Sequence, residues 1–505
     1  MGGCGWRTAG IAVLLMVSQA CAQDVTLTAL NGGISVNGLL QGYDGEFYRV
    51  ETSYGMLTVD GQGVICDGPA CPDLTAPKAE IRFEGAPDAG LALLPRLVAA
   101  FAATRGLTYS RGSDADFSAT IADPSTNKPV AEFSFLSATP EEAHAALAAG
   151  RAELIVAAAV EPDFGHRALA LDALLPIVAP DNLTPRISTV DLARALTGEV
   201  TNWRFIGGPD MPIVLHGLAA DSDLQRALVA RLGSDTAPTI VHPTMASLAK
   251  AVTEDPWALA VTARAMQGDA RALLLTDSCS FSLLPSPLAV KADDYPLSLP
   301  IFLLTPRRRL PLFAREFLAF LGTSAAQDSI RAAGFIDRSV QRLAMTGDGL
   351  RLINAIQGAG KEVSLTDLKR LVDGMAGADR LSLTFRFEDG SSTLDAHSME
   401  NLTDLARLLE TGAFRGEELV FAGFSDGSGD AGDNLLLSRT RALSVSAALR
   451  SAAPQLPFER IPTVEAYGET MPMACDSTEP GRQLNRRVEV WVKPAVVKDI
   501  PAPGN

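Results

Sequence analysis

The sequence predicts a multidomain protein in which a small N-terminal β module precedes a long α/β domain and a C-terminal α+β domain. At 505 residues, the chain is too long for one ordinary hydrophobic core. Residues 23–75 hold short apolar runs separated by glycine turns, which is typical of antiparallel strands. Residues 79–339 alternate strand-type and helix-type patterns, which favours an α/β domain with a largely parallel sheet. Residues 381–495 begin with an alternating strand pattern, followed by a helical one over residues 396–410.

Two further segments complete this division of the chain. Residues 340–380 contain two amphipathic helical patterns, Gly349–Ile356 and Ser364–Met375, and we expect a helical linker there. Residues 496–505 are rich in proline and glycine, which predicts a disordered tail.

The first 22 residues have the pattern of a cleaved secretory signal. Arg7 precedes an apolar run from Ile11 to Val17, and Ala20-Cys21-Ala22 forms an Ala-x-Ala type cleavage site. A lipid anchor on Cys21 is the alternative, but Ser18 stands where that motif requires an aliphatic residue. We therefore expect cleavage after Ala22 and a mature protein in an exported compartment. No later stretch is long and apolar enough to predict a transmembrane segment.

The net charge excludes some classes of partner, and the cysteine spacing predicts a disulfide. The formal net charge is −16, which argues against nucleic acid and anionic lipid as partners. Cys66 and Cys71 flank a turn, and in an oxidising compartment this spacing predicts a local disulfide. A zinc site is not predicted, because no second cysteine pair or nearby histidine completes a ligand set. Cys279 and Cys475 can pair only if their domains touch, and the sequence leaves this open.

The stretch from Gly423 to Ala442 places two opposite charges near one another. It follows an apolar strand pattern, crosses a polar glycine-rich loop and enters a helical pattern. Asp426 is expected at the strand end, and Arg441 about a turn into the helix. An anion and a cation in this arrangement suit a small zwitterion, because arginine binds a carboxylate through two hydrogen bonds.

These residues resemble the OmpA-like peptidoglycan-binding family. The matching motifs are Gly423-Phe-Ser-Asp426, Asn434 with Leu437-Ser438, Arg441-Ala442 with Val445, and Asn485-Arg-Arg-Val-Glu489. The resemblance implies that Asp426 and Arg441 hold the amine and the carboxylate of diaminopimelate in wall peptides. We expect the remaining peptidoglycan-binding residues to be Asn434, Asp389 and Arg486. The alternative is that Asp426 only caps the loop and Arg441 is a solvated helix residue.

Two other motifs overlap this loop. Gly423–Gly427 formally matches the Gly-x-Ser-x-Gly elbow of hydrolases, but all five histidines precede Ser425. The loop also imitates an EF-hand, yet Ala431 and Leu437 replace its required glycine and glutamate. We therefore predict a protein that is not an enzyme and needs no cofactor or metal.

A second resemblance covers most of residues 79–339. The segment Ile187–Gly208, which contains Asn202-Trp203, is similar to phosphate-binding proteins of ABC transporters, and Asp255–Ala260 and Tyr295-Pro-Leu297 follow in the same order. This resemblance implies a type 2 periplasmic-binding-protein-like fold, in which two α/β lobes clamp a ligand with helix N-termini.

The candidate solute-binding residues depart from that family. Pro87 removes an amide donor, and Asp88 adds a negative charge where an oxyanion would bind. Acidic residues and His216 also replace the expected arginine and Ser-Gly-Thr in the second lobe. The candidate cleft residues are Asp88, Ser137, Glu153, His216 and Ser222. A small anion remains one candidate ligand, and a scaffold with a changed or lost ligand remains the other.

Together these patterns predict a periplasmic protein associated with the cell wall and the inner face of the outer membrane. Its C-terminal domain would bind peptidoglycan, and its solute-binding-protein-like module would act as a wall-tethered receptor or scaffold. The alternative is an extracytoplasmic component that delivers phosphate or another oxyanion to an ABC transporter.

Overall fold

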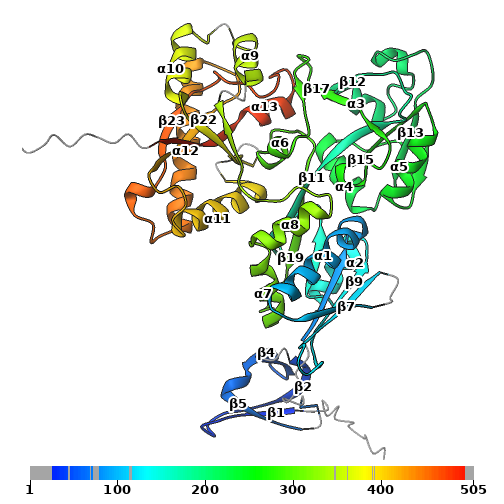
Figure 1. Cartoon of the computed structure of the whole chain (residues 1–505), viewed down its shortest axis with the longest axis vertical. Helices are drawn as coiled ribbons and strands as arrows, with labels where there is room; N and C mark the ends of the chain where they lie inside the picture. The colour runs from blue at the N-terminus through cyan, green and yellow to red at the C-terminus, as the bar shows by residue number, and fades with distance from the viewer. Residues whose placement is uncertain are drawn as a thin grey trace, which may run out of the picture.

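A computed structural model describes residues 25–43, 46–68, 70–71, 79–112, 116–345, 349–360, 362–388, 391 and 393–494. The expected signal peptide, the expected tail and Asp389 lie outside these ranges. Figure 1 shows a small β module at one end, a two-lobed region in the middle, and a C-terminal body beside the second lobe. Within the described ranges, no helix has the length and apolar character needed to cross a bilayer.

The N-terminal module is a five-stranded antiparallel sheet. Its strands are β1 (Val25–Ala29), β2 (Ser35–Tyr43), β3 (Phe47–Thr52), β4 (Gly55–Asp60) and β5 (Val64–Asp67), in the order β4-β3-β2-β1-β5. Cys66 and Cys71 form the expected disulfide. The module contacts the first lobe, where Arg309 lies 3.9 Å from the ring centroid of Phe47 and Arg315 pairs with Glu46.

One sheet path runs through both lobes of the middle region. Its order is β14-β13-β15-β11-β19-β10-β6-β9-β8-β7. The long strands β11 (Gly165–Val178) and β19 (Ser298–Thr305) lie at its centre and join the lobes (Figure 1). The sheet is mixed, whereas we expected a largely parallel one. Strands β6, β9 and β10 are parallel neighbours, but β11 and β19 pair antiparallel, because β11 leads the chain into the second lobe and β19 leads it back.

The first lobe carries strands β6 (Ala79–Gly85), β7 (Thr108–Arg111), β8 (Phe117–Ala122), β9 (Pro129–Ser137) and β10 (Leu154–Ala157), with helices α1 (Pro87–Thr104), α2 (Pro140–Ala148), α7 (Leu312–Phe320) and α8 (Ser324–Ala332). Helix α2 begins with a capping box in which Thr139 and Glu142 each accept a backbone amide hydrogen of the other residue. The sequence Thr139-Pro-Glu-Glu thus supplies the cap, a proline at the start of the helix and two acidic residues in its first turn.

The second lobe contains β13 (Val214–Leu218), β14 (Ile240–His242) and β15 (Ala258–Ala263), with helices α3 (Thr189–Leu196), α4 (Asp223–Leu232) and α5 (Met245–Glu254). A small separate sheet of β12 (Arg186–Ser188), β17 (Leu274–Thr276) and β18 (Ser282–Leu283) precedes α6 (Pro287–Lys291). This small sheet and α6 face the C-terminal body (Figure 1).

The C-terminal sheet has the order β20-β21-β24-β22-β23, so its last strand in sequence, β24 (Arg487–Pro494), is central. The other strands are β20 (Arg342–Ala344), β21 (Asp379–Phe385), β22 (Glu417–Phe424) and β23 (Thr463–Ala466). Helices α11 (Ala396–Glu410) and α12 (Ala431–Ala452) contribute to one core cluster with side chains such as Leu381 and Val490.

Residues 340–380 are part of this C-terminal body, although we expected a linker. Strand β20 pairs with β21 at the edge of the sheet. Helices α9 (Gly349–Gln357) and α10 (Leu365–Met375) supply Ala355, Leu371 and Met375 to a second core cluster that contains Trp491. The amphipathic patterns that suggested a linker reflect burial of one helix face against the sheet.

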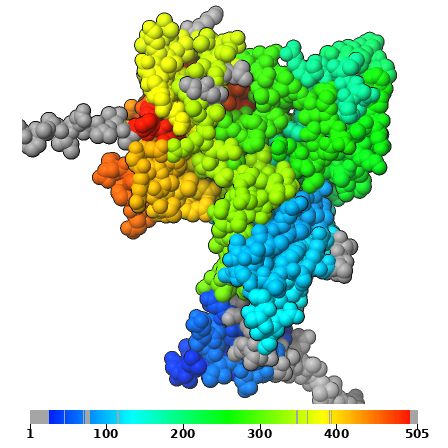
Figure 2. Space-filling view, in the orientation of Figure 1, coloured from blue at the N-terminus to red at the C-terminus, as the bar shows by residue number. Residues whose placement is uncertain are grey.

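The C-terminal body is fastened to the middle region by charge pairs and a disulfide. Arg380 donates to Asp294 at 2.6 Å, and both side chains are buried. Cys279, beside β17, is bonded to Cys475, which settles the pairing that the sequence left open. Arg338 also pairs with Asp404 at 2.5 Å. Figure 2 shows the resulting close packing of the yellow C-terminal residues against the green ones.

Candidate functional site

Asp426 lies two residues after the end of β22, close to the strand end where the sequence predicts it. Its side chain is largely buried, and its Oδ1 accepts the backbone amide hydrogen of Ser428 at 3.0 Å. Its Oδ2 lies 3.3 Å from Arg486 Nη1. Asp426 thus serves as the loop cap that we considered, and it also presents a charged oxygen to a neighbouring arginine.

Arg441 lies on α12, which packs tightly onto β22. A Cβ on Gly423 would lie 2.1 Å from the carbonyl oxygen of Ser438, so only glycine permits this approach. The Arg441 guanidinium lies 6.0 Å from the ring centroid of Phe387. Within the described chain, its buried Nη1 has no hydrogen-bond partner. Burial and the charge of Arg486 lower the pKa of Arg441, whereas Asp426 raises it. Arg441 is therefore a desolvated cation that an added anion would stabilise.

Arg486 connects the two sides of this site. It is the residue between α13 (Glu479–Asn485) and β24, and it pairs with both Asp426 and Glu479. Asn434 points elsewhere, because its amide donates to Glu469 at 2.7 Å. The structure brings together Asp426, Arg486 and the neighbouring Arg441 through charge interactions, whereas the Asn434 amide is engaged by Glu469.

A cavity of about 670 Å³ opens beside Arg441 and Arg486. Arg386 and Phe387 line it from the C-terminal body, whereas Arg231 and Tyr295 line it from the middle region. Sequence reasoning missed these four residues. Arg386 and Phe387 belong to the recognisable alternating pattern at residues 383–387, but nothing in the local pattern places Arg231 near Arg441.

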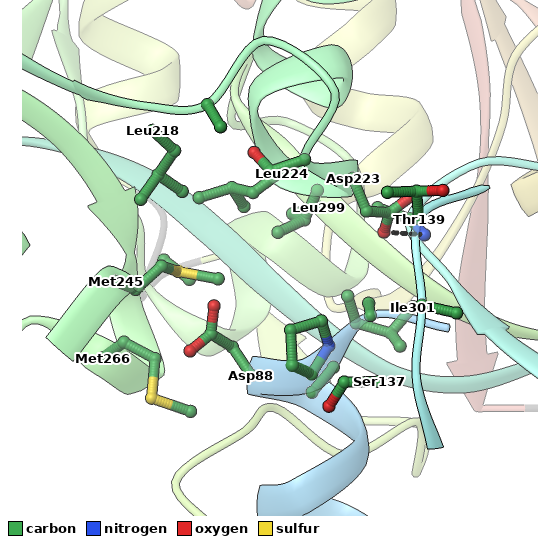
Figure 3. Close-up of a pocket in the computed structure, with 18 of the residues that line it drawn as sticks. Asp88, Ser137, Thr139, Leu218, Asp223, Leu224, Met245, Met266, Leu299 and Ile301 are labelled. Atoms are coloured by element: carbon green, nitrogen blue, oxygen red, sulfur yellow. Dashed lines mark hydrogen bonds between the residues drawn. The ribbon is translucent and has the colours of Figure 1, made fainter. Parts of the chain in front are cut away.

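A second cavity, of about 340 Å³, lies between the two lobes of the middle region. Asp88, Ser137 and Ser222 line it, as we expected of a solute cleft. In Figure 3 the Asp88 carboxylate projects between Met245 and Met266. The remaining apolar wall includes Leu218, Leu224, Leu299, Ile301 and Phe335.

The charged residues lining this interlobe cavity are all acidic: Asp88, Glu142, Asp172, Asp221 and Asp223. Burial raises the pKa of Asp172 to about 7, although the amides of Ala173 and Ala265 oppose the shift. Burial likewise raises the pKa of Asp223 to about 6, against the effects of Ala158 and Arg226. A phosphate dianion would meet carboxylates here without a lining lysine, arginine or histidine.

Acidic side chains of one lobe bind groups of the other across this cavity. The amide of Ala158 in the first lobe donates to Asp223 Oδ2 at 2.7 Å, the bond drawn in Figure 3. Glu141 of the first lobe also pairs with Arg226 of the second. Burial raises the pKa of Asp88, and the backbone amide of Met245, the first residue of α5, opposes this rise. The Asp88 carboxylate thus lies near a helix N-terminus of the kind that binds anions.

Glu153 and His216 do not line the interlobe cavity. Glu153 precedes β10, at the end of the strand opposite the cavity, where its carboxylate accepts hydrogen bonds from Arg82 at 3.0 Å. His216 Nδ1 lies 2.9 Å from His242 Nε2, and the two rings stack. Both residues therefore have structural partners outside the candidate cleft.

The described residues contain no group of three or more histidine, cysteine, aspartate or glutamate side chains suited to a metal ion. The Ser425 hydroxyl of the hydrolase-like motif is buried, and in the described chain it has no hydrogen-bond partner.

Comparison with known proteins shows which family the region around Asp426, Arg441 and Arg486 resembles. Residues 386–486 match the model of the OmpA family. The C-terminal region contains an OmpA domain. An outer-membrane lipoprotein, YfiB of Pseudomonas aeruginosa, is 36% identical to this chain over 106 residues, which cover 21% of this chain and 60% of YfiB. This chain therefore spans less than two thirds of that relative. The 106 aligned residues are about as long as the match to the OmpA family model, residues 386–486.

Two solved structures are similar to about half of the chain. An ABC-type phosphate transport receptor from Vibrio cholerae is 18% identical, covers 51% of this chain and 99% of its own, and has a TM-score of 0.40. A phosphate ABC transporter substrate-binding protein from Clostridium perfringens, solved with bound phosphate, is 16% identical with the same coverages and a TM-score of 0.41.

Proposed function

We propose that this chain is a non-enzymatic periplasmic protein that binds peptidoglycan through its OmpA domain and carries the two-lobed module as a wall-tethered receptor or scaffold. In this proposal Arg441 binds the carboxylate of diaminopimelate, and Asp426 binds its amine. The desolvated, incompletely bonded guanidinium of Arg441 beside Asp426 and Arg486 is the observation that carries the proposal.

The chemistry of a zwitterionic ligand fits this arrangement. A carboxylate supplies acceptors for the buried Nη1 of Arg441, where burial strengthens a charge-assisted hydrogen bond. An ammonium group suits Asp426, whose Oδ2 has Arg486 as a partner at 3.3 Å. The OmpA-family match and the outer-membrane relative support the same envelope location.

Retention on purified peptidoglycan tests this function. We expect R441A and D426A each to lower retention on diaminopimelate-containing peptidoglycan at least about tenfold, because a hydrogen bond to a charged group contributes about 1.5–3 kcal/mol. Free diaminopimelate should compete with the wild-type protein for the wall. The measurement is the fraction of protein that cosediments with the insoluble wall.

R439A is a matched control, because Arg439 is an exposed arginine on the same helix α12. It should retain wild-type binding. Equal retention of wild-type, R441A and D426A proteins would contradict the wall-binding function. Thermal melting of each variant separates lost binding from lost folding.

The transport alternative is less well supported by the cleft. The interlobe cavity is lined by five acidic side chains and by no basic one, and the Asp88 carboxylate lies near the helix N-terminus at Met245. We therefore propose a receptor or scaffold in preference to a phosphate carrier.

A further inference from the structure

The cavity beside Arg441 has walls from two different parts of the chain. The OmpA domain contributes Phe387, Arg441 and Arg486, and the middle region contributes Arg231, Asp293 and Tyr295. Arg231 is in the last turn of α4, and the other two residues follow α6. A ligand seated on Arg441 therefore faces a surface that the OmpA domain alone does not possess.

The two walls are held in a fixed relation by bonds close to the cavity. Arg386 donates to the carbonyl oxygen of Asp293 at 2.7 Å and to that of Leu484 in its own domain at 2.7 Å. Arg380 pairs with Asp294 at 2.6 Å, and the Cys279–Cys475 disulfide crosses the same interface. These contacts preorganise the cavity, which lowers the entropic cost of binding a ligand between the walls.

Arg231 is a cation of this cavity without a carboxylate partner of its own. It is half-buried, and its Nη1 lies 3.5 Å from the carbonyl oxygen of Ala227 in the same helix. In the part of the chain that the structure describes, no carboxylate forms an ion pair with it, and the nearby Asp293 pairs with Arg386 instead. Arg231 is thus available to a second anionic group of a ligand that is bound at Arg441.

We propose that the cavity is one composite binding site, in which Arg231 of the solute-binding-protein-like module binds a second carboxylate of the wall peptide held by Asp426 and Arg441. The inference rests on the proposed function. A free carboxyl end of a stem peptide supplies such a group, whereas a peptide whose end is amidated or joined to another peptide does not. The site therefore prefers wall peptides with a free terminal carboxylate.

Titration calorimetry of the full-length protein with two soluble peptides tests the inference. The probes are a diaminopimelate-containing stem peptide with a free C-terminal carboxylate and the same peptide as its C-terminal amide. The wild-type protein should bind the free acid about tenfold more tightly, in keeping with one added charge-assisted hydrogen bond. R231Q should lose this preference and bind both peptides with the affinity that the wild-type protein shows for the amide.

Two further variants make the result specific to Arg231. R231K keeps the charge and should keep part of the preference, and R186Q changes an exposed arginine of the same lobe and should bind as the wild type does. Equal wild-type affinities for the two peptides, or an unchanged preference in R231Q, would overturn the composite site.

The experiment also separates this inference from the proposed function on which it rests. R441A should lose binding of both peptides. If R441A binds poorly but R231Q behaves as the wild type, the wall-binding function stands and only the composite site fails. If R441A binds both peptides normally, the proposed function fails.

Discussion

Asp223 is a carboxyl group whose ionisation the fold disfavours. Its pKa is raised to about 6 by burial, although the amide of Ala158 and the charge of Arg226 oppose this effect. An aspartate in the unfolded chain has a pKa near 3.9. The folded state therefore binds the proton of Asp223 more strongly than the unfolded state does. The contribution of this group to the free energy of unfolding is fully present below about pH 4 and is lost as the pH rises through about 6.

We predict that the free energy of unfolding of the wild-type protein rises as the pH falls from 7.5 to 5. In D223N this rise should be smaller by about 1–3 kcal/mol, since each pKa unit corresponds to about 1.4 kcal/mol. The carboxamide introduced by this substitution would still accept the hydrogen bond from Ala158. The pKa of Asp337 is lowered to about 2, where burial is outweighed by hydrogen bonds from Ser339 and Lys291, so that group acts below this window. Urea unfolding at both pH values measures the difference, and identical pH slopes in the two proteins would contradict it.

Helices α1, α4 and α5 determine what the interlobe cavity can accept. Asp88 lies in the first turn of α1, where the first amide of α5 opposes the rise in its pKa that burial causes. Asp223 lies in the first turn of α4 and accepts a hydrogen bond from Ala158 of the other lobe. Helix N-termini attract anions through their unpaired amides and their dipoles. Here the protein's own carboxylates lie where an anion would otherwise bind, and Asp223 also bonds the opposite lobe.

Phosphate should therefore fail to stabilise the two-lobed region. A ligand at a hundred times its dissociation constant stabilises a protein by about 2.7 kcal/mol, which is a readily measured shift in melting temperature. We expect no saturable shift with millimolar phosphate when chloride at equal ionic strength is the reference. A saturable shift specific to phosphate would contradict this expectation and favour the transport alternative.

At the scale of the whole molecule, the Cys279–Cys475 disulfide joins the second lobe to the OmpA domain across 196 positions of sequence. A cross-link over such a long loop restricts the unfolded chain strongly, and loss of a native disulfide typically costs about 2–4 kcal/mol. The same bond lies at the interface that forms the cavity beside Arg441. Its removal should affect both stability and ligand binding.

We predict that C279S/C475S unfolds at lower denaturant concentration than the wild type and binds the free-acid stem peptide more weakly. Urea unfolding and calorimetry measure the two effects. C66S/C71S is the matched control, because this disulfide lies within the N-terminal sheet and its removal should leave peptide binding unchanged. Equal peptide affinity in C279S/C475S and the wild type would show that the interface does not need this bond.

Local sequence patterns predicted those elements whose formation depends on nearby residues alone. The helix expected at residues 396–410 has those bounds in the structure. The pairing of Asp426 with Arg486 was not predicted, because it arises where β22 and β24 pair in the sheet. We expected Glu153 and His216 in the cleft, but Glu153 lies at the end of β10 opposite the cavity and His216 bonds His242. Which end of a strand meets the cleft depends on how the strands assemble, and the local sequence pattern does not encode this. The position of Arg231 in the cavity and the formation of the Cys279–Cys475 bond depend on how the middle region packs against the C-terminal body. The sequence pattern of either segment alone does not encode this packing.

The central position of β24 has a consequence for the order in which the protein matures. Strand β24 pairs with both β21 and β22, although it follows every other described strand in sequence, and Arg486 immediately precedes it. During synthesis, the lobes are therefore complete while the middle of the C-terminal sheet is still missing. The β module and the lobes can fold first, and the pairing of Arg486 with Asp426 forms only after β24 has joined the sheet.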